Sequence, residues 1–270
     1  MQHIKFIFWL LPSIFFPNNV NKNLDKNSVL FCYGKLKANN VKNYKYVVLE
    51  SLNFSSKEIK EIKQNNNKNV LSYISLGEVN SNAIHYNRLK NSTLGKNSNW
   101  DSYYLNLKDK KTREVLIQLI KDNLNKGFDG MFLDNIDNFT QFGPQKDDKY
   151  ELISFLKSLK KMFPNKVFIQ NAGLELLDQT HKQIDGVVLE SVATSYSFKD
   201  KKYQLKDKKS FDIYIKKILA YKQKYNIKFI FIEYADSKSL YDKVTKRLLK
   251  YNIDYFIGKI DLQTIPNYLK

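Results

Sequence analysis

Residues 127–137 read Gly127-Phe128-Asp129-Gly130-Met131-Phe132-Leu133-Asp134-Asn135-Ile136-Asp137, and this stretch decides the fold. Its centre is a strand-sized apolar run, and a cluster of polar residues that includes two carboxylates follows directly. Two other strand-sized runs also end in an acid, at Glu190 and at Glu233. We therefore expect separate strands to bring carboxylates to one edge of a sheet, an arrangement typical of acid/base chemistry on a neutral or cationic substrate.

Apolar strand-sized runs alternate with helix-sized amphipathic stretches along most of the chain, which is typical of parallel βα units. The eight expected strands cover residues 29–33, 46–50, 70–75, 130–134, 167–171, 186–190, 228–233 and 254–258. An open doubly wound sheet usually has fewer strands and a glycine-rich first turn, and the sequence has no Gly-x-Gly-x-x-Gly motif. We predict an α/β fold, a (β/α)8 TIM barrel that forms a single domain over residues 29–270.

Helix boundaries support this alternation. The expected helices are a run from Ser55 to Gln64, and residues 112–126, 147–162, 210–225 and 237–250. Capping residues precede several of them, and Gly127 or a proline follows others. The eighth helix is expected to be short or absent.

The longest connection, residues 76–109, follows the third strand. It should lie on the C-terminal face of the barrel, where barrel enzymes hold their active sites. We expect it to roof a substrate groove.

Composition narrows the classes of function. The chain has 270 residues and a formal net charge of +18, because Lys and Arg outnumber Asp and Glu by 45 to 27. Such a balance is found in nucleic-acid-binding proteins, but here the lysines occur together with many asparagines and lie mainly in helix-like stretches. We interpret them as solvated surface and expect no nucleic-acid partner.

Metal and disulfide chemistry have little support in the sequence. Cys32 is the only cysteine, which excludes an intrachain disulfide or a cysteine-built zinc site. His3, His85 and His181 do not form a metal-binding motif. No metal site and no cofactor are expected.

The N-terminus resembles an export signal. Lys5 precedes the apolar run 6–11, which is short for a membrane span and suits the apolar region of a signal peptide. Residues 1–28 are therefore predicted to be a signal peptide, or an uncleaved anchor, followed by a polar linker. This predicts a secreted or periplasmic protein, in contact with a membrane only through that segment, while a buried first helix is the alternative.

Asp134 and Glu190 are the predicted catalytic pair. They end the fourth and sixth strands, and alternate strands of a barrel contribute side chains to the same layer. Neighbouring strands lie about 4.8 Å apart, so the two acids should face each other across the mouth of the barrel. Glycosidic bond cleavage requires two carboxyl groups roughly 5 to 9 Å apart.

Other residues near strand ends or in the long connection are expected to bind the substrate. Asn171, which ends the fifth strand, should lie between the two acids and donate a hydrogen bond to a carboxylate or a sugar hydroxyl. Asp129 precedes its strand, so it should lie at the opposite end and form a structural contact. The full set of expected substrate-binding residues is Tyr33, Glu78, Trp100, Asn135, Asp137, Asn171, Tyr196, Glu233 and Tyr234.

Four motifs in consistent order resemble a known family. They are Tyr73-Ile74-Ser75-Leu76-Gly77-Glu78, the stretch 127–137 quoted above, Asn171-Ala172-Gly173 and Leu189-Glu190-Ser191. Over about residues 29 to 260 the chain resembles the endo-α-1,4-polygalactosaminidase barrels of glycoside hydrolase family 114 and the related hydrolase domain of the Pel exopolysaccharide system. The stretch 127–137 carries most of the specificity of this resemblance.

The resemblance implies endo-acting cleavage of an α-1,4-linked galactosamine or N-acetylgalactosamine polysaccharide. By analogy with α-retaining barrels, it assigns Asp134 as the nucleophile and Glu190 as the acid/base. The alternative is a barrel that binds carbohydrate without turnover and serves polysaccharide export or assembly. The sequence gives no oligomeric state.

Overall fold

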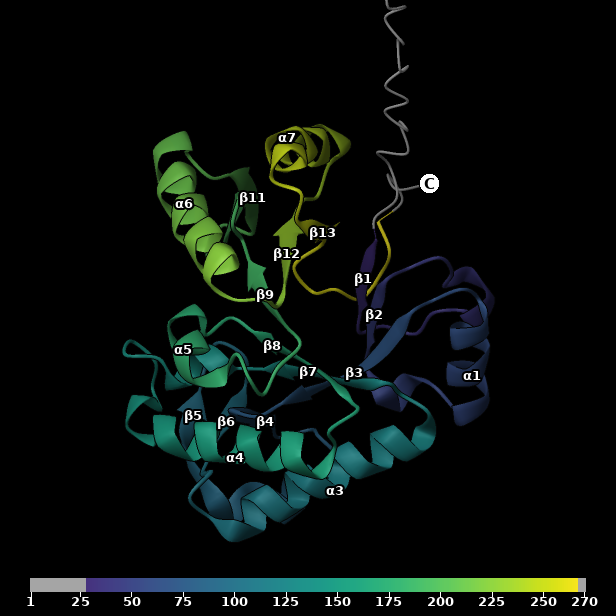
Figure 1. Cartoon of the computed structure of the whole chain (residues 1–270), viewed down its shortest axis with the longest axis vertical. Coiled ribbons are helices and arrows are strands. Elements are labelled where there is room, and N and C mark those ends of the chain that lie inside the picture. Colours follow the sequence, from purple (N-terminus) through teal and green to yellow (C-terminus); the bar gives the residue numbers. More distant parts are fainter. Residues whose placement is uncertain (1–27, 267–270) are drawn as a thin grey trace, which may run out of the picture.

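The computed structural model describes residues 28–266 and has a barrel of parallel strands at its centre (Figure 1). The strands at residues 29–32, 130–134 and 186–190 begin at apolar runs and are buried on nearly every residue. The barrel strands are β1 (Val29–Cys32), β2 (Tyr46–Leu49), β3 (Asn69–Ser75), β7 (Gly130–Asp134), β8 (Val167–Asn171), β9 (Gly186–Glu190), β12 (Lys228–Tyr234) and β13 (Asp254–Gly258). All eight strands expected from the sequence are present, and the predicted TIM barrel is confirmed.

The strand order is β1-β2-β3-β7-β8-β9-β12-β13, with every neighbouring pair parallel. The two outer strands lie next to each other, where Ser28 Oγ donates to Asp254 Oδ1 at 2.5 Å. The barrel is thus nearly closed. Its register places Ser75 beside Asp134, and Glu190 beside Ile232.

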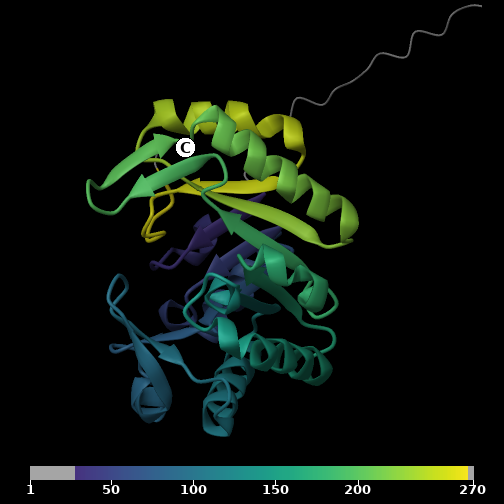
Figure 2. The same ribbon diagram turned by 90° about the vertical axis from the view of Figure 1, so that its left-hand side faces the viewer.

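Helices cover the outside of the barrel (Figures 1 and 2). Ser55 caps α1 through a reciprocal pair of bonds with Glu58, and Gly127, with φ of 114°, ends α3 in the left-handed region that favours glycine. The longer helices are α1 (Ser56–Gln64), α3 (Lys110–Lys126), α4 (Lys149–Met162), α6 (Lys208–Lys224) and α7 (Lys238–Leu248), and α2 (Tyr86–Leu89) and α5 (Leu177–Thr180) are single turns. The helical segments connect successive strands as the βα alternation predicts.

Two insertions extend from the C-terminal ends of the strands. The long connection after β3 forms an antiparallel sheet of β4 (Glu78–Asn80), β6 (Ser102–Leu105) and β5 (Thr93–Asn97), in the order β4-β6-β5. The connection after β9 forms a hairpin of β10 (Thr194–Ser197) and β11 (Lys202–Leu205). Figure 2 shows both insertions reaching out on the same side of the molecule.

Apart from Ser28, the predicted signal or anchor segment 1–28 lies outside the described residues. Within residues 28–266, no helix has the length and apolar character needed to cross a bilayer.

Candidate active site

Asp134, Asn171 and Glu190 meet at the C-terminal end of the barrel. They are the last residues of β7, β8 and β9. The side-chain Nδ2 of Asn171 donates to Asp134 Oδ1 at 2.8 Å and to Glu190 Oε1 at 2.6 Å. The two bound oxygens therefore lie no farther apart than these two distances added together. This upper limit lies below the roughly 6.5–9.5 Å of inverting glycosidases and agrees with the closer spacing, roughly 5–5.5 Å, of retaining ones.

Tyrosine hydroxyls bind the remaining carboxylate oxygens. Tyr73 of β3 donates to Asp134 Oδ2 at 2.8 Å, and Tyr234 at the end of β12 donates to Glu190 Oε2. The ring of Tyr33 lies 4.8 Å from that of Tyr73, centroid to centroid. Each acid thus accepts from two neutral donors, and no lysine or arginine pairs with either one among the described residues.

Burial favours the protonated form of Glu190. Removal from water raises the pKa of its carboxyl, and the nearby charge of Asp134 adds to this rise, while the hydrogen bonds from Tyr234 and Asn171 oppose it. A raised pKa keeps a carboxyl protonated over a wider pH range, which favours a role as general acid.

Asn135 and Asp137 lie beside this pair in the turn that follows β7. Asn135 has φ of 61°, in the left-handed region, and its Oδ1 accepts from Ser75 Oγ at 2.6 Å. Asp137 is exposed at the rim, where surrounding protein atoms and then the charge of Asp134 raise the pKa of its carboxyl. A third acid is therefore available at the edge of the site.

Glu78, the first residue of β4, is buried within the first insertion. Its carboxylate accepts from Asn97 at 3.1 Å, from Ser102, and from Asn138 at 2.9 Å. These bonds join the β4-β6-β5 sheet to the turn after β7. Glu78 thus holds the insertion against the barrel.

Glu233 differs from the role expected for it. Successive side chains of a strand point to opposite faces, and Tyr234 points to Glu190, so Glu233 points away from the mouth. It is fully buried, and both of its oxygens accept hydrogen bonds from Ala193 and Thr194. The prediction put Glu233 and Tyr234 at one site because it did not consider that neighbouring residues of a strand point to opposite faces.

Aromatic residues from both insertions meet at the rim. Trp100, in the turn between β5 and β6, packs edge-on against Phe198, in the turn between β10 and β11, with 5.4 Å between ring centroids. Phe198 also packs against Tyr196 at 5.0 Å. Trp100 and Phe198 are 54% and 60% exposed, so their rings are accessible to a ligand.

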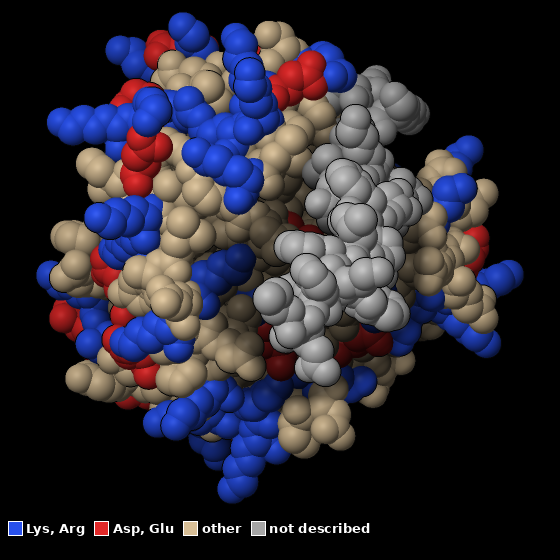
Figure 3. Space-filling model, turned by 45° about the horizontal axis from the view of Figure 1, so that its top comes forward, with Lys and Arg blue, Asp and Glu red and all other residues tan. Residues whose placement is uncertain are grey.

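The surface charge is dispersed. Figure 3 shows Lys and Arg side chains spread over one face, with acidic side chains among them. Within residues 28–266, no group of three or more His, Cys, Asp or Glu side chains has an arrangement that could hold a metal ion.

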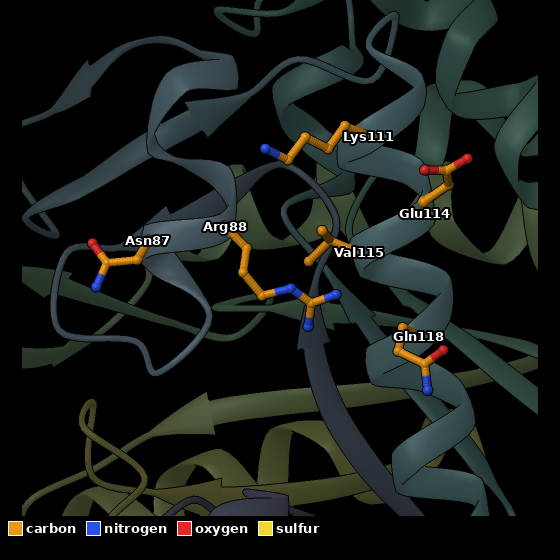
Figure 4. Close-up of a pocket in the computed structure, with 6 residues that line it drawn as sticks. All are labelled: Asn87, Arg88, Lys111, Glu114, Val115 and Gln118. Carbon is orange, nitrogen blue, oxygen red and sulfur yellow. The ribbon is translucent and has the colours of Figure 1, made fainter.

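A depression whose lining includes neither Asp134 nor Glu190 lies between α2 and α3 (Figure 4). It has a volume of about 530 Å³, and Arg88 extends across it from α2 toward α3. Glu114 is the only acid among its six lining residues, which are Asn87, Arg88, Lys111, Glu114, Val115 and Gln118. It therefore lacks the carboxyl pair that the strand ends provide.

Two residues of the site were missed by sequence reasoning. Tyr73 lies two positions before the end of β3, and counting back by two from Ser75 would have placed it on the inner face. Phe198 gave no such signal, because its hairpin has no apolar core run.

The family model of glycoside-hydrolase family GH114 matches residues 20–268 of the chain. No curated protein sequence matches the chain.

Solved structures share the fold. The glycoside hydrolase domain of PelA from Pseudomonas aeruginosa is similar with a TM-score of 0.78 and 20% identity, over 88% of this chain and 96% of that one. Ega3 of Aspergillus fumigatus, solved in complex with galactosamine, is similar with a TM-score of 0.65 and 15% identity, over 87% and 90% of the two chains. Because the family match spans nearly the whole chain, the protein belongs to glycoside-hydrolase family GH114 and is a glycosidase with a TIM-barrel fold.

Proposed function

We propose that this glycosidase is an endo-acting hydrolase of an α-1,4-linked galactosamine or N-acetylgalactosamine polysaccharide, with Asp134 and Glu190 as its catalytic pair. The observation that carries the proposal is the amide of Asn171, which hydrogen-bonds both acids at once. Family membership and the galactosamine bound to Ega3 support the substrate class. A site whose acids have no cationic partner among the described residues also suits a polymer that carries amino groups.

In the first step of the proposed mechanism, Glu190 donates its proton to the glycosidic oxygen while an oxygen of Asp134 attacks the anomeric carbon. The glycosidic bond breaks, the leaving chain departs with a free hydroxyl, and a covalent glycosyl ester forms on Asp134. The raised pKa of Glu190 supports its role as acid.

In the second step, Glu190 removes a proton from water, which attacks the same carbon and releases Asp134. Two inversions give a product with the α configuration of the substrate. The short distance between the carboxyl oxygens supports this retaining route over an inverting one, which needs space for water between the acids.

The other residues expected to bind the substrate differ in how closely they lie to the two acids. Tyr33, Asn171 and Tyr234 surround the acids, Asn135 and Asp137 lie at the rim, and Trp100 and Tyr196 offer rings for stacking on sugar faces. Glu78 and Glu233 are occupied by internal hydrogen bonds, so the proposed substrate contacts do not include them.

The test uses Asp134→Asn and Glu190→Gln, with Asp129→Asn as the matched control because Asp129 lies at the other end of the same strand region. A positioned general acid contributes about 10²–10⁴-fold, so each active-site variant should lower the release of oligosaccharides from α-1,4-linked galactosamine polymer by at least about 10²-fold. The control should keep wild-type turnover. Full activity in either active-site variant would refute the assignment.

Product analysis separates the remaining possibilities. Nuclear magnetic resonance should detect the α anomer of the new reducing end before mutarotation, whereas an initial β anomer would rule out retention. Release of long fragments early in the reaction is expected for endo action. A wild-type protein that binds the polymer without forming any product would instead favour the non-catalytic binding barrel.

A further inference from the structure

Glu233 is the penultimate residue of β12 and has none of its surface exposed. A buried carboxylate is costly unless hydrogen bonds satisfy it. Its Oε1 accepts from the backbone N of Ala193 at 2.8 Å, and its Oε2 accepts from the backbone N and the Oγ1 of Thr194 at 2.9 and 2.6 Å. All three donors belong to the segment that directly follows Glu190.

This segment, residues 191–194, has an unusual backbone. Ser191 has φ of 53°, in the left-handed region that a residue with a Cβ rarely adopts. Such a conformation persists only where surrounding contacts enforce it. The Ser191 N–H donates to the Ile232 carbonyl of β12 at 2.9 Å, so the strand next to β9 fixes both ends of the segment.

Cations bind the carbonyl groups of the same segment. Lys206 Nζ donates to the Ser191 carbonyl at 2.5 Å, and a guanidinium N–H of Arg247 reaches the Ala193 carbonyl at 3.4 Å. Glu233 therefore binds the N–H groups of the segment while Lys206 and Arg247 bind its C=O groups. The Glu233 carboxylate lies on the outer face of β12 because the N–H groups that it binds lie there.

Glu233 and Tyr234 connect to Glu190 by two routes. Tyr234 donates directly to the Glu190 carboxylate, and its own backbone N–H donates to Thr194 Oγ1 at 3.1 Å. Thr194 thus joins the Glu233 carboxylate to the backbone of Tyr234. A shift of residues 191–194 would move Glu190 from one side and Tyr234 from the other.

We propose that Glu233 is a positioning residue for Glu190, which fixes the backbone behind the catalytic acid through Ala193 and Thr194. The inference rests on the proposed function of Glu190, but its structural part can be measured without substrate turnover. Glu233 touches no sugar, so its loss changes the chemical step rather than substrate binding.

The protonation of the Glu233 carboxyl makes the proposal testable by pH titration. Burial raises the pKa of its carboxyl to about 7, against hydrogen bonds from Thr194 and Ala193 and the charge of Lys206, which lower it. Lys206, directly after β11, Tyr214 of α6 and Arg247 of α7 are titratable groups that face this region. Protonation of Glu233 weakens it as an acceptor for the N–H groups of Ala193 and Thr194. The carboxylate therefore holds residues 191–194 most firmly above this pH.

The experiment compares Glu233→Gln with Asp148→Asn, which alters a buried carboxylate outside the site that pairs with Lys108. On an α-1,4-linked galactosamine oligosaccharide, Glu233→Gln should lower kcat about ten- to a hundredfold per folded molecule and leave KM within about twofold. Asp148→Asn should leave both constants unchanged. A wild-type kcat in Glu233→Gln, or a rise in KM alone, would overturn the proposal.

A second readout does not need turnover. In the wild type, the amide resonances of Ala193 and Thr194 should titrate together with a midpoint near pH 7, and in Glu233→Gln this titration should vanish. If Glu233→Gln does not fold, Thr194→Val is measured in its place. It removes one donor to Glu233 and keeps the side-chain shape, and it should speed hydrogen exchange at the Ala193 amide. Unchanged titration in Glu233→Gln, or unchanged exchange in Thr194→Val, would refute the role even if the oligosaccharide proved not to be a substrate.

Discussion

Strands β7 and β9 have an acid at each end, and the two ends are built differently. At the N-terminal end, Asp129 lies 2.6 Å from Lys63, and Asp185 lies 3.1 Å from Lys160. Each of these acids also accepts from the backbone N–H of the second residue of a neighbouring strand, Val70 of β3 at 2.9 Å and Phe168 of β8 at 2.8 Å. The N-terminal acids thus join adjacent strands and carry their own counter-ions.

At the C-terminal end of the same strands, Asp134 and Glu190 share the amide of Asn171 and bind tyrosine hydroxyls. Neutral donors orient a carboxylate without cancelling its charge, and burial then moves its pKa. The comparison teaches that strand-end acids are told apart by their partners. At the ends of β7 and β9, the cationic partners belong to the acids that stabilise the barrel, and the neutral donors belong to the two acids that we propose exchange a proton.

The largest effect is expected from Asn171→Asp, which breaks the neutral surroundings of the C-terminal acids. A third carboxylate would replace the donor shared by Asp134 and Glu190, and like charges at this distance disfavour ionisation of the group. Turnover should fall on the order of 10²–10³-fold, since it removes much of what positioned acid/base catalysis contributes. Steady-state kinetics on the galactosamine polymer would measure this.

Asn67→Asp is the matched control for a buried asparagine. Its Nδ2 donates to the carbonyls of Val41 and Ile62, on the outer layer of the barrel. This variant should lose stability but keep its turnover per folded molecule. Near-wild-type turnover in Asn171→Asp would show that the neutral amide is not what distinguishes the two ends.

The sequence predicted the barrel because each of its signals is local. The strand 130–134 consists of an apolar run that ends in Asp134, and α1 begins at the capping box of Ser55 and Glu58, so both are found where expected. The hairpin β10–β11 could not be found in this way, because its residues are half-exposed and its aromatic contacts come from another insertion.

The partners of a side chain were harder to predict than its place in the sequence. Asp134, Asn171 and Glu190 were placed together because strand ends meet at one edge of a parallel sheet. The direction of Glu233 depends on which face of β12 turns inward, and its donors lie about 40 residues away. Such contacts depend on how the connection after β9 folds, and its sequence has no helical or strand periodicity from which that fold could be predicted.

A moderate effect on stability is expected at the N-terminal end. Asp185→Ala removes the ion pair with Lys160 and the acceptor of the Phe168 N–H, and a hydrogen bond to a charged group contributes about 1.5–3 kcal/mol. Because Asp185 is partly exposed, we expect the free energy of unfolding to fall by about 1–2 kcal/mol. Denaturant unfolding would measure the change.

Asp185→Asn keeps an acceptor for the Phe168 N–H and should cost less than Asp185→Ala. Both variants should retain the wild-type kcat per folded molecule. A loss of kcat without a loss of stability would mean that the acids at the two ends are not separated in function.

The smallest effect is expected from Tyr234→Phe, which removes one neutral donor and leaves the rest of the site intact. The hydrogen bond from Tyr234 lowers the pKa of Glu190, so its loss should raise that pKa further. Glu190 must be protonated to act as the acid, and activity is lost as the pH rises through its pKa. The alkaline limb of the kcat/KM profile should therefore move to higher pH, while turnover at neutral pH falls about three- to tenfold, as one net hydrogen bond allows.

Tyr73→Phe, which removes the hydroxyl bound to Asp134 instead, should leave the alkaline limb in place. If both variants moved that limb equally, the two acids would titrate as one unit, and the separate roles given to them would have to be replaced by a shared proton.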